Sequence, residues 1–148
     1  MRAGSCRGDA RGDRLVPRFS PAVVDHFTNP RNAGRLDQAD VTAFIGNPVC
    51  GDQILLSAQI RDDVVSRIGF EAYGCSASLA VASILTERLS GMPVRDIETI
   101  QAAQVIEWSG GLSPEQQHVA ALGVDVAQRL ANNYRNGIHE DVSALPGS

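Results

Sequence analysis

The sequence predicts an α+β fold, with a small antiparallel three-stranded sheet packed against several helices. The prediction rests on the order in which strand-like and helix-like spacings of apolar residues occur along the chain. Apolar and polar residues alternate over 54–60 and 64–73, and β-branched residues are frequent in 41–45. After residue 75 the apolar residues recur at helical spacing. A period of two indicates strands and a period near 3.6 indicates helices. Strands followed by helices are typical of a sheet covered on one side.

Start and stop signals support each predicted element. Ser20 and Pro21 resemble an N-cap and a first-turn proline, so they predict a helix over 21–28. The short polar stretch 61–63 predicts a hairpin between the last two strands. Glycine, proline and serine separate the later apolar stretches and predict helices at 76–89, 94–100, 102–107 and from Pro114 to about residue 133.

Composition limits the classes of function. The chain has 148 residues and is 43% hydrophobic, which suits one domain over 19–136 with a disordered tail at 1–18 and a flexible tail at 137–148. A net charge of −4 leaves no basic stripe, so nucleic acid is not expected as a partner. No apolar run approaches the ~20 residues of a bilayer span, so no membrane partner is expected. The three unevenly placed cysteines and the lack of an apolar signal core predict a cytoplasmic protein.

Four residues carry groups that bind metals. Cys50 and Asp52 lie two residues apart in a glycine-flanked loop between strands, where both side chains can face one point. Cys75 opens the strongest predicted helix, where the helix dipole favours a thiolate, and His118 lies early in the last helix. Each has a structural alternative, because a lone cysteine is often a small buried apolar residue and a lone histidine is often solvated. The spacing fits no short zinc-finger pattern.

A longer pattern is more specific. The chain contains the segments Asn-Pro-Arg-Asn-Ala-Gly at 29–34, Gly-Asn-Pro-Val-Cys-Gly-Asp at 46–52 and Tyr-Gly-Cys-Ser at 73–76. In order and spacing these segments resemble the U-type iron-sulfur cluster scaffold family, which comprises IscU, SufU and the N-terminal domain of NifU. The resemblance covers residues 19–134 and implies the family's α+β fold.

The resemblance also implies a function. Members hold zinc or a nascent [2Fe-2S] cluster on three cysteines and an aspartate, receive sulfur from a cysteine desulfurase and pass the cluster to acceptor proteins. Carried over to this chain, Cys50, Asp52 and Cys75 match three of these ligands, and His118 is a fourth candidate. Iron or a [2Fe-2S] cluster is therefore the expected cargo, with zinc as the alternative occupant and a homo-oligomer as a possible assembly. Enzymatic catalysis is not expected.

One departure from the family leaves a second interpretation open. The family's third cysteine follows a histidine at the start of the last long helix, where this chain has Val119 after His118. Valine can neither bind a metal nor carry a persulfide. The alternative function is therefore a zinc-binding partner or regulator of a cysteine desulfurase, or a persulfide acceptor using Cys50 or Cys75, without cluster assembly.

Overall fold

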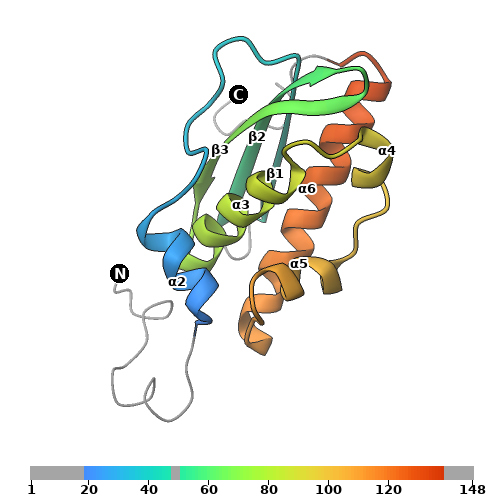
Figure 1. The fold of residues 1–148 in the computed structure, drawn as a ribbon. Helices are drawn as coiled ribbons and strands as arrows, with labels where there is room; N and C mark the ends of the chain where they lie inside the picture. The colour runs from blue at the N-terminus through green and yellow to red at the C-terminus, as the bar shows by residue number, and fades with distance from the viewer. Residues whose placement is uncertain (1–18, 48–50, 139–148) are drawn as a thin grey trace, which may run out of the picture.

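The sheet of the computed structural model contains three antiparallel strands in the order β1-β2-β3 within the described residues, which are 19–47 and 51–138. They are β1 (Val41–Asn47), β2 (Asp52–Arg61) and β3 (Val64–Tyr73) (Figure 1). Asp62 and Asp63 connect β2 to β3 with φ of 54° and 61°, which is the pair of positive values that a type I′ hairpin turn requires. The predicted strands and hairpin are confirmed, and β1 and β2 are each longer by a few residues. The predicted tail at 1–18 and most of that at 137–148 lie outside the described residues.

The helices of the described chain follow the predicted order with two differences. They are α2 (Pro21–Thr28), α3 (Ser76–Leu89), α4 (Val94–Ile97), α5 (Ala102–Trp108) and α6 (Gln117–Arg135). Helix α4 ends three residues before the predicted position. Pro114 does not open the last α-helix, because Pro114–Gln116 forms a separate 3₁₀ turn before α6 begins. The Gln116 side chain closes that turn by accepting from the Ser113 backbone N–H at 3.3 Å, so this cap belongs to the short turn.

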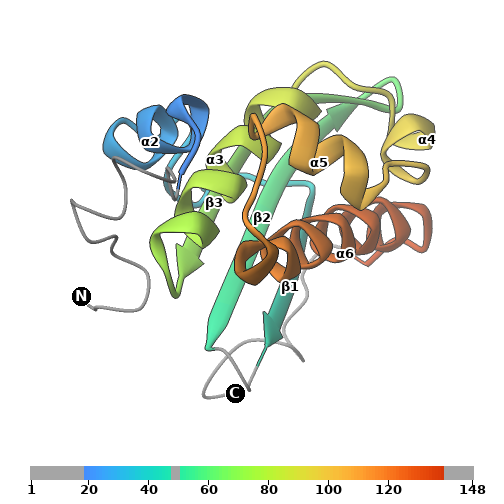
Figure 2. The same ribbon diagram turned by 90° about the horizontal axis from the view of Figure 1, so that it is seen from below.

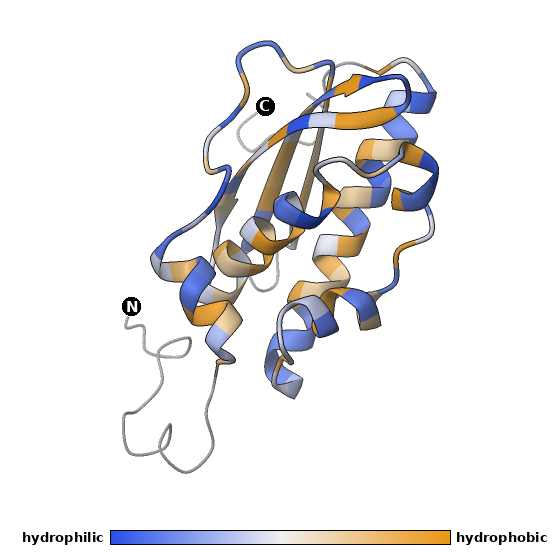
Figure 3. Cartoon of the chain, viewed as in Figure 1, coloured by the Kyte–Doolittle hydropathy of each residue, from blue (hydrophilic) through white to orange (hydrophobic). Residues whose placement is uncertain are grey.

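Two long helices cover one face of the sheet. Helix α3 packs on β3 and α6 packs on β1 and β2, while α2 lies against α3 and α5 against α6 (Figures 1 and 2). Apolar residues predominate along the strands of the sheet, whereas α6 alternates between apolar and polar residues along its length (Figure 3). This pattern places an apolar core between the sheet and the two helices, with fully buried residues including Leu56, Phe70, Leu85 and Leu130.

The segment before β1 packs against the outer edge of β3 and the opposite face of the sheet. Its Gly34 backbone N–H donates to the Phe70 carbonyl at 2.7 Å, and the Leu36 N–H donates to the Ser57 hydroxyl at 3.0 Å. A Cβ atom at Gly69 would collide with the Gly34 carbonyl, so glycine is needed at this crossing. Within the described residues, no helix combines the length and the apolar composition that spanning a membrane requires.

Candidate functional site

The buried carboxylate of Asp52 is the centre of the candidate site. Asp52 is the first residue of β2, and its side chain is 3% exposed. Its Oδ1 accepts hydrogen bonds from the Ser78 hydroxyl at 2.8 Å and from the Cys75 backbone N–H at 3.2 Å. Its Oδ2 lies 2.8 Å from Nε2 of His118. The Asp52 carboxylate therefore lies where three elements begin, namely β2, α3 and α6. This point is at the lower end of the molecule in Figure 1.

Cys75 brings a thiol to the same end of the molecule. It is the N-cap residue of α3, and its side chain is half-buried. The unpaired N–H groups and the dipole at a helix N-terminus favour a thiolate over a thiol. Cys75 Sγ lies 3.6 Å from the Ser78 hydroxyl, so the sulfur and the Asp52 carboxylate share a neighbour. The structure thus brings together Cys75 and Asp52, two of the predicted site residues, with the Cys75 backbone N–H 3.2 Å from Asp52 Oδ1.

His118 is the second residue of α6, and its imidazole is 38% exposed. A lone histidine is often solvated, but the bond of His118 to Asp52 places its imidazole beside the other predicted site residues. The next residue, Val119, is fully buried in the apolar core. The position where the family carries its third cysteine therefore contributes packing, while the adjacent imidazole contributes the polar contact.

Two residues near Asp52 were not singled out from the sequence. Gly74 has a φ of +128°, and a Cβ atom there would collide with the Asp52 carboxylate. Ser78 is fully buried and donates to that same carboxylate. The signal for Ser78 was present, since it lies three residues after Cys75 and is a polar residue on the apolar face of α3.

The four predicted ligands are Cys50, Asp52, Cys75 and His118, and Cys50 lies outside the described residues. Within residues 19–47 and 51–138, no three side chains of histidine, cysteine, aspartate or glutamate are grouped so that they could hold a metal ion. In this geometry Asp52 Oδ2 and His118 Nε2 bond to each other. The four-ligand set therefore stays a prediction.

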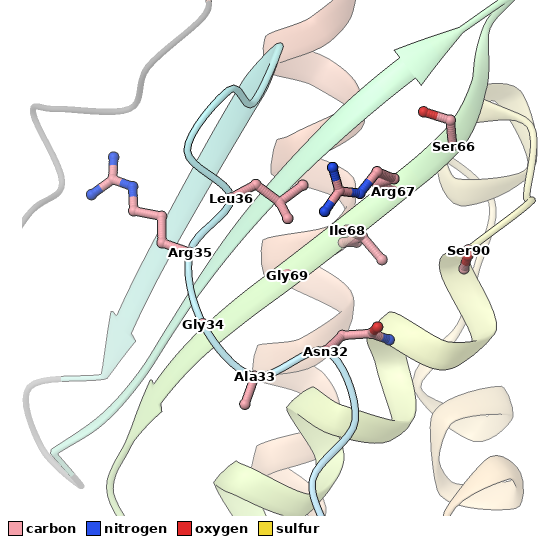
Figure 4. A pocket seen from close by; sticks show the side chains of 10 residues that line it. All are labelled: Asn32, Ala33, Gly34, Arg35, Leu36, Ser66, Arg67, Ile68, Gly69 and Ser90. Carbon is pink, nitrogen blue, oxygen red and sulfur yellow. The ribbon is translucent and has the colours of Figure 1, made fainter.

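A hollow lies on the surface away from this site. It has a volume of about 350 Å³ and is lined by residues 32–36, by residues 66–69 of β3 and by Ser90 (Figure 4). It occurs where the outer edge of β3 is uncovered, between the backbone contacts of Gly34 with Phe70 and of Gly91 with Val65. In Figure 4 the side chain of Arg35 points away from the hollow. None of the predicted site residues lines it, so it is separate from the Asp52 site.

Comparison with known proteins identifies the family. The family described as NifU-like N terminal domain matches residues 18–141. The iron-sulfur cluster assembly scaffold protein IscU 1 of Archaeoglobus fulgidus is 34% identical over 129 residues, covering 86% of this chain and 84% of that protein. The corresponding IscU of Azotobacter vinelandii is 32% identical over 122 residues, covering 80% and 94%. The family match and these relatives show a U-type scaffold domain, and the chain belongs to the NifU-like N terminal domain family.

Solved structures agree with the fold. The N-terminal NifU-like protein of Brucella abortus superposes with a TM-score of 0.65 at 16% identity, covering 79% of this chain and 94% of that chain. A SUF-system scaffold protein described as putative, from Fervidobacterium islandicum, gives a TM-score of 0.61 at 17% identity, covering 76% and 96%. At these identities the likeness concerns the fold alone, and it confirms the predicted α+β architecture.

Proposed function

We propose that this chain is an iron-sulfur cluster scaffold or carrier, which holds iron or a [2Fe-2S] cluster as its cargo and passes that cargo to acceptor proteins. The observation that supports it most is the Asp52 carboxylate, held beside Cys75 at one end of the fold. The names of the relatives, which are cluster assembly scaffold proteins, point the same way. A cysteine desulfurase is the proposed source of sulfur, and a homo-oligomer is a possible assembly.

The proposed ligands differ in the strength with which they hold the cargo. Thiolates from Cys50 and Cys75 suit iron, whereas the oxygen of Asp52 is a harder and weaker partner for it. One weak ligand suits a carrier, because the cargo has to leave. His118 can contribute its Nε2 as a ligand only after the bond of that nitrogen to Asp52 opens.

A specific observation supports the alternative function. Val119 fills the core with an apolar side chain at the position where the family places a thiol, so the described site offers one sulfur atom, that of Cys75. With Cys50 the proposed set would be two sulfurs, one oxygen and one nitrogen, which also suits zinc in a tetrahedral site. A zinc-binding regulator of a desulfurase, or a persulfide acceptor, is therefore the second candidate.

Anaerobic reconstitution with iron, sulfide and a desulfurase tests the choice. A stable visible chromophore with matching iron and sulfide contents is expected for a scaffold. Tightly held zinc without a chromophore would favour the regulator. After incubation with a desulfurase and cysteine, an extra sulfur on Cys50 or Cys75 in mass spectrometry would favour the persulfide acceptor.

The variant Asp52→Asn tests the role of the carboxylate. Its amide oxygen can still accept from Ser78 and Cys75, but the oxygen proposed to bind the cargo is lost. Transfer of the cluster to an apo-acceptor should slow roughly tenfold, which corresponds to about 1.4 kcal/mol in activation free energy. Asp37→Asn removes an exposed carboxylate and is the matched control. Equal transfer rates in both variants would exclude Asp52 as a cargo ligand.

A further inference from the structure

Helix α3 carries three buried hydroxyls on its otherwise apolar inner side, those of Ser78, Ser83 and Thr86. Ser83 and Thr86 bond with the loop before β1. The Arg31 backbone N–H donates to Ser83 Oγ at 2.8 Å, and the side-chain amide of Asn32 donates to Thr86 Oγ1 at 3.2 Å. Ser78 instead donates to Asp52, at the start of β2. The three hydroxyls therefore serve two different parts of the molecule.

The two oxygens of Asp52 have different surroundings. Oδ1 accepts two hydrogen bonds, both from α3, and its donors are a fully buried hydroxyl and a backbone amide. Oδ2 bonds to the imidazole of His118, which is 38% exposed. Because a helix holds its groups more rigidly than an exposed side chain does, Oδ1 is fixed and Oδ2 is the exchangeable oxygen.

We infer that Ser78 is a positioning residue for cargo binding. Together with the backbone N–H of Cys75, its hydroxyl occupies Oδ1 of Asp52. Oδ2 is then the single oxygen that Asp52 offers to iron. The inference rests on the proposed function. The hydrogen bond from Ser78 fixes the rotation of the carboxylate, and it leaves Oδ2 on the side of His118. Groups that orient a metal ligand in this way strongly affect the affinity and geometry of the site.

Co²⁺ is a suitable probe, because its visible absorption reports both the number and the geometry of its ligands. Ser78→Ala removes the hydroxyl that orients Asp52. Ser83→Ala is the matched control, since it removes another fully buried hydroxyl from the same helix without touching the site. Both proteins are titrated with Co²⁺ under anaerobic conditions, and their thermal unfolding is measured in parallel.

Ser78→Ala should raise the dissociation constant for Co²⁺ about tenfold and change the ligand-field bands, whereas Ser83→Ala should match the wild type in both. Identical affinity and bands in the two variants would overturn the inference, even where both lose stability. Failure of the proposed function is a separate result, namely that the wild type itself gains no iron-sulfur chromophore on reconstitution. If the wild type binds Co²⁺ but forms no cluster, the scaffold function is excluded. The inference about Ser78 then still stands on the weaker Co²⁺ binding of Ser78→Ala.

Discussion

At the scale of single residues, Gly74 determines whether Asp52 can occupy its place. Its φ of +128° lies in a region that residues with a Cβ rarely adopt. A Cβ atom would also collide with Oδ1 of Asp52, the oxygen that accepts the hydrogen bond from the Ser78 hydroxyl. Two independent reasons therefore require glycine directly before Cys75.

The variant Gly74→Ala should cost about 3 kcal/mol in unfolding free energy. The backbone conformation accounts for roughly 1–2 kcal/mol, and displacement of the carboxylate from its buried donors accounts for the rest. Gly91→Ala is the matched control, because Gly91 has a φ of +83° and no atom within 4 Å of an added Cβ. It should cost about 1 kcal/mol. Urea unfolding measures both, and equal losses would show that Asp52 moves aside without penalty.

At the scale of elements, a buried histidine joins α2 to α3. His26 could be interpreted from the sequence as a cation at the end of its helix, but it is 7% exposed. Its Nδ1 lies 2.8 Å from the Ser83 hydroxyl and its Nε2 lies 3.3 Å from Glu87. Burial lowers the pKa of His26, and the nearby Arg31 lowers it further, against the opposite effects of Glu87 and Asp25. The contact between these helices therefore favours a neutral imidazole.

This contact predicts a pH dependence with a defined sign. The folded pKa of His26 lies below its ordinary value of 6.5, so the unfolded chain binds the proton more readily. The stability that neutral His26 contributes is fully present above about pH 6.5 and is lost as the pH falls toward the folded pKa. The wild type should therefore lose more unfolding free energy than His26→Gln between pH 7.5 and 5. Parallel loss in the two proteins would contradict this assignment.

At the scale of the whole molecule, local sequence patterns predicted the helices and strands, but they could not predict the contacts between residues far apart in the sequence. The bounds of helix α3 could be predicted because the signals that determine them are local. The apolar residues lie within the helix, Cys75 directly precedes it and Gly91 follows two residues after its end. The bond between His118 and Asp52 joins residues 66 positions apart, and no local period encodes it. Resemblance to a family indicated that these residues belong together. It did not indicate that Ser78 and Gly74 hold the carboxylate, because those roles depend on the distance between β2 and α3.

The same long-range contacts predict that occupation of the site stabilises the whole fold, since it connects the starts of β2, α3 and α6. Zn²⁺ at about a hundredfold excess over its dissociation constant should add about 2.7 kcal/mol of stability. For a domain of this size the Tm should rise by roughly 10 °C, and a chelator should reverse the rise. Cys75→Ala should abolish most of the shift, while Asp37→Asn should leave it intact, as differential scanning calorimetry can measure. A full shift in Cys75→Ala would place the zinc elsewhere on the chain.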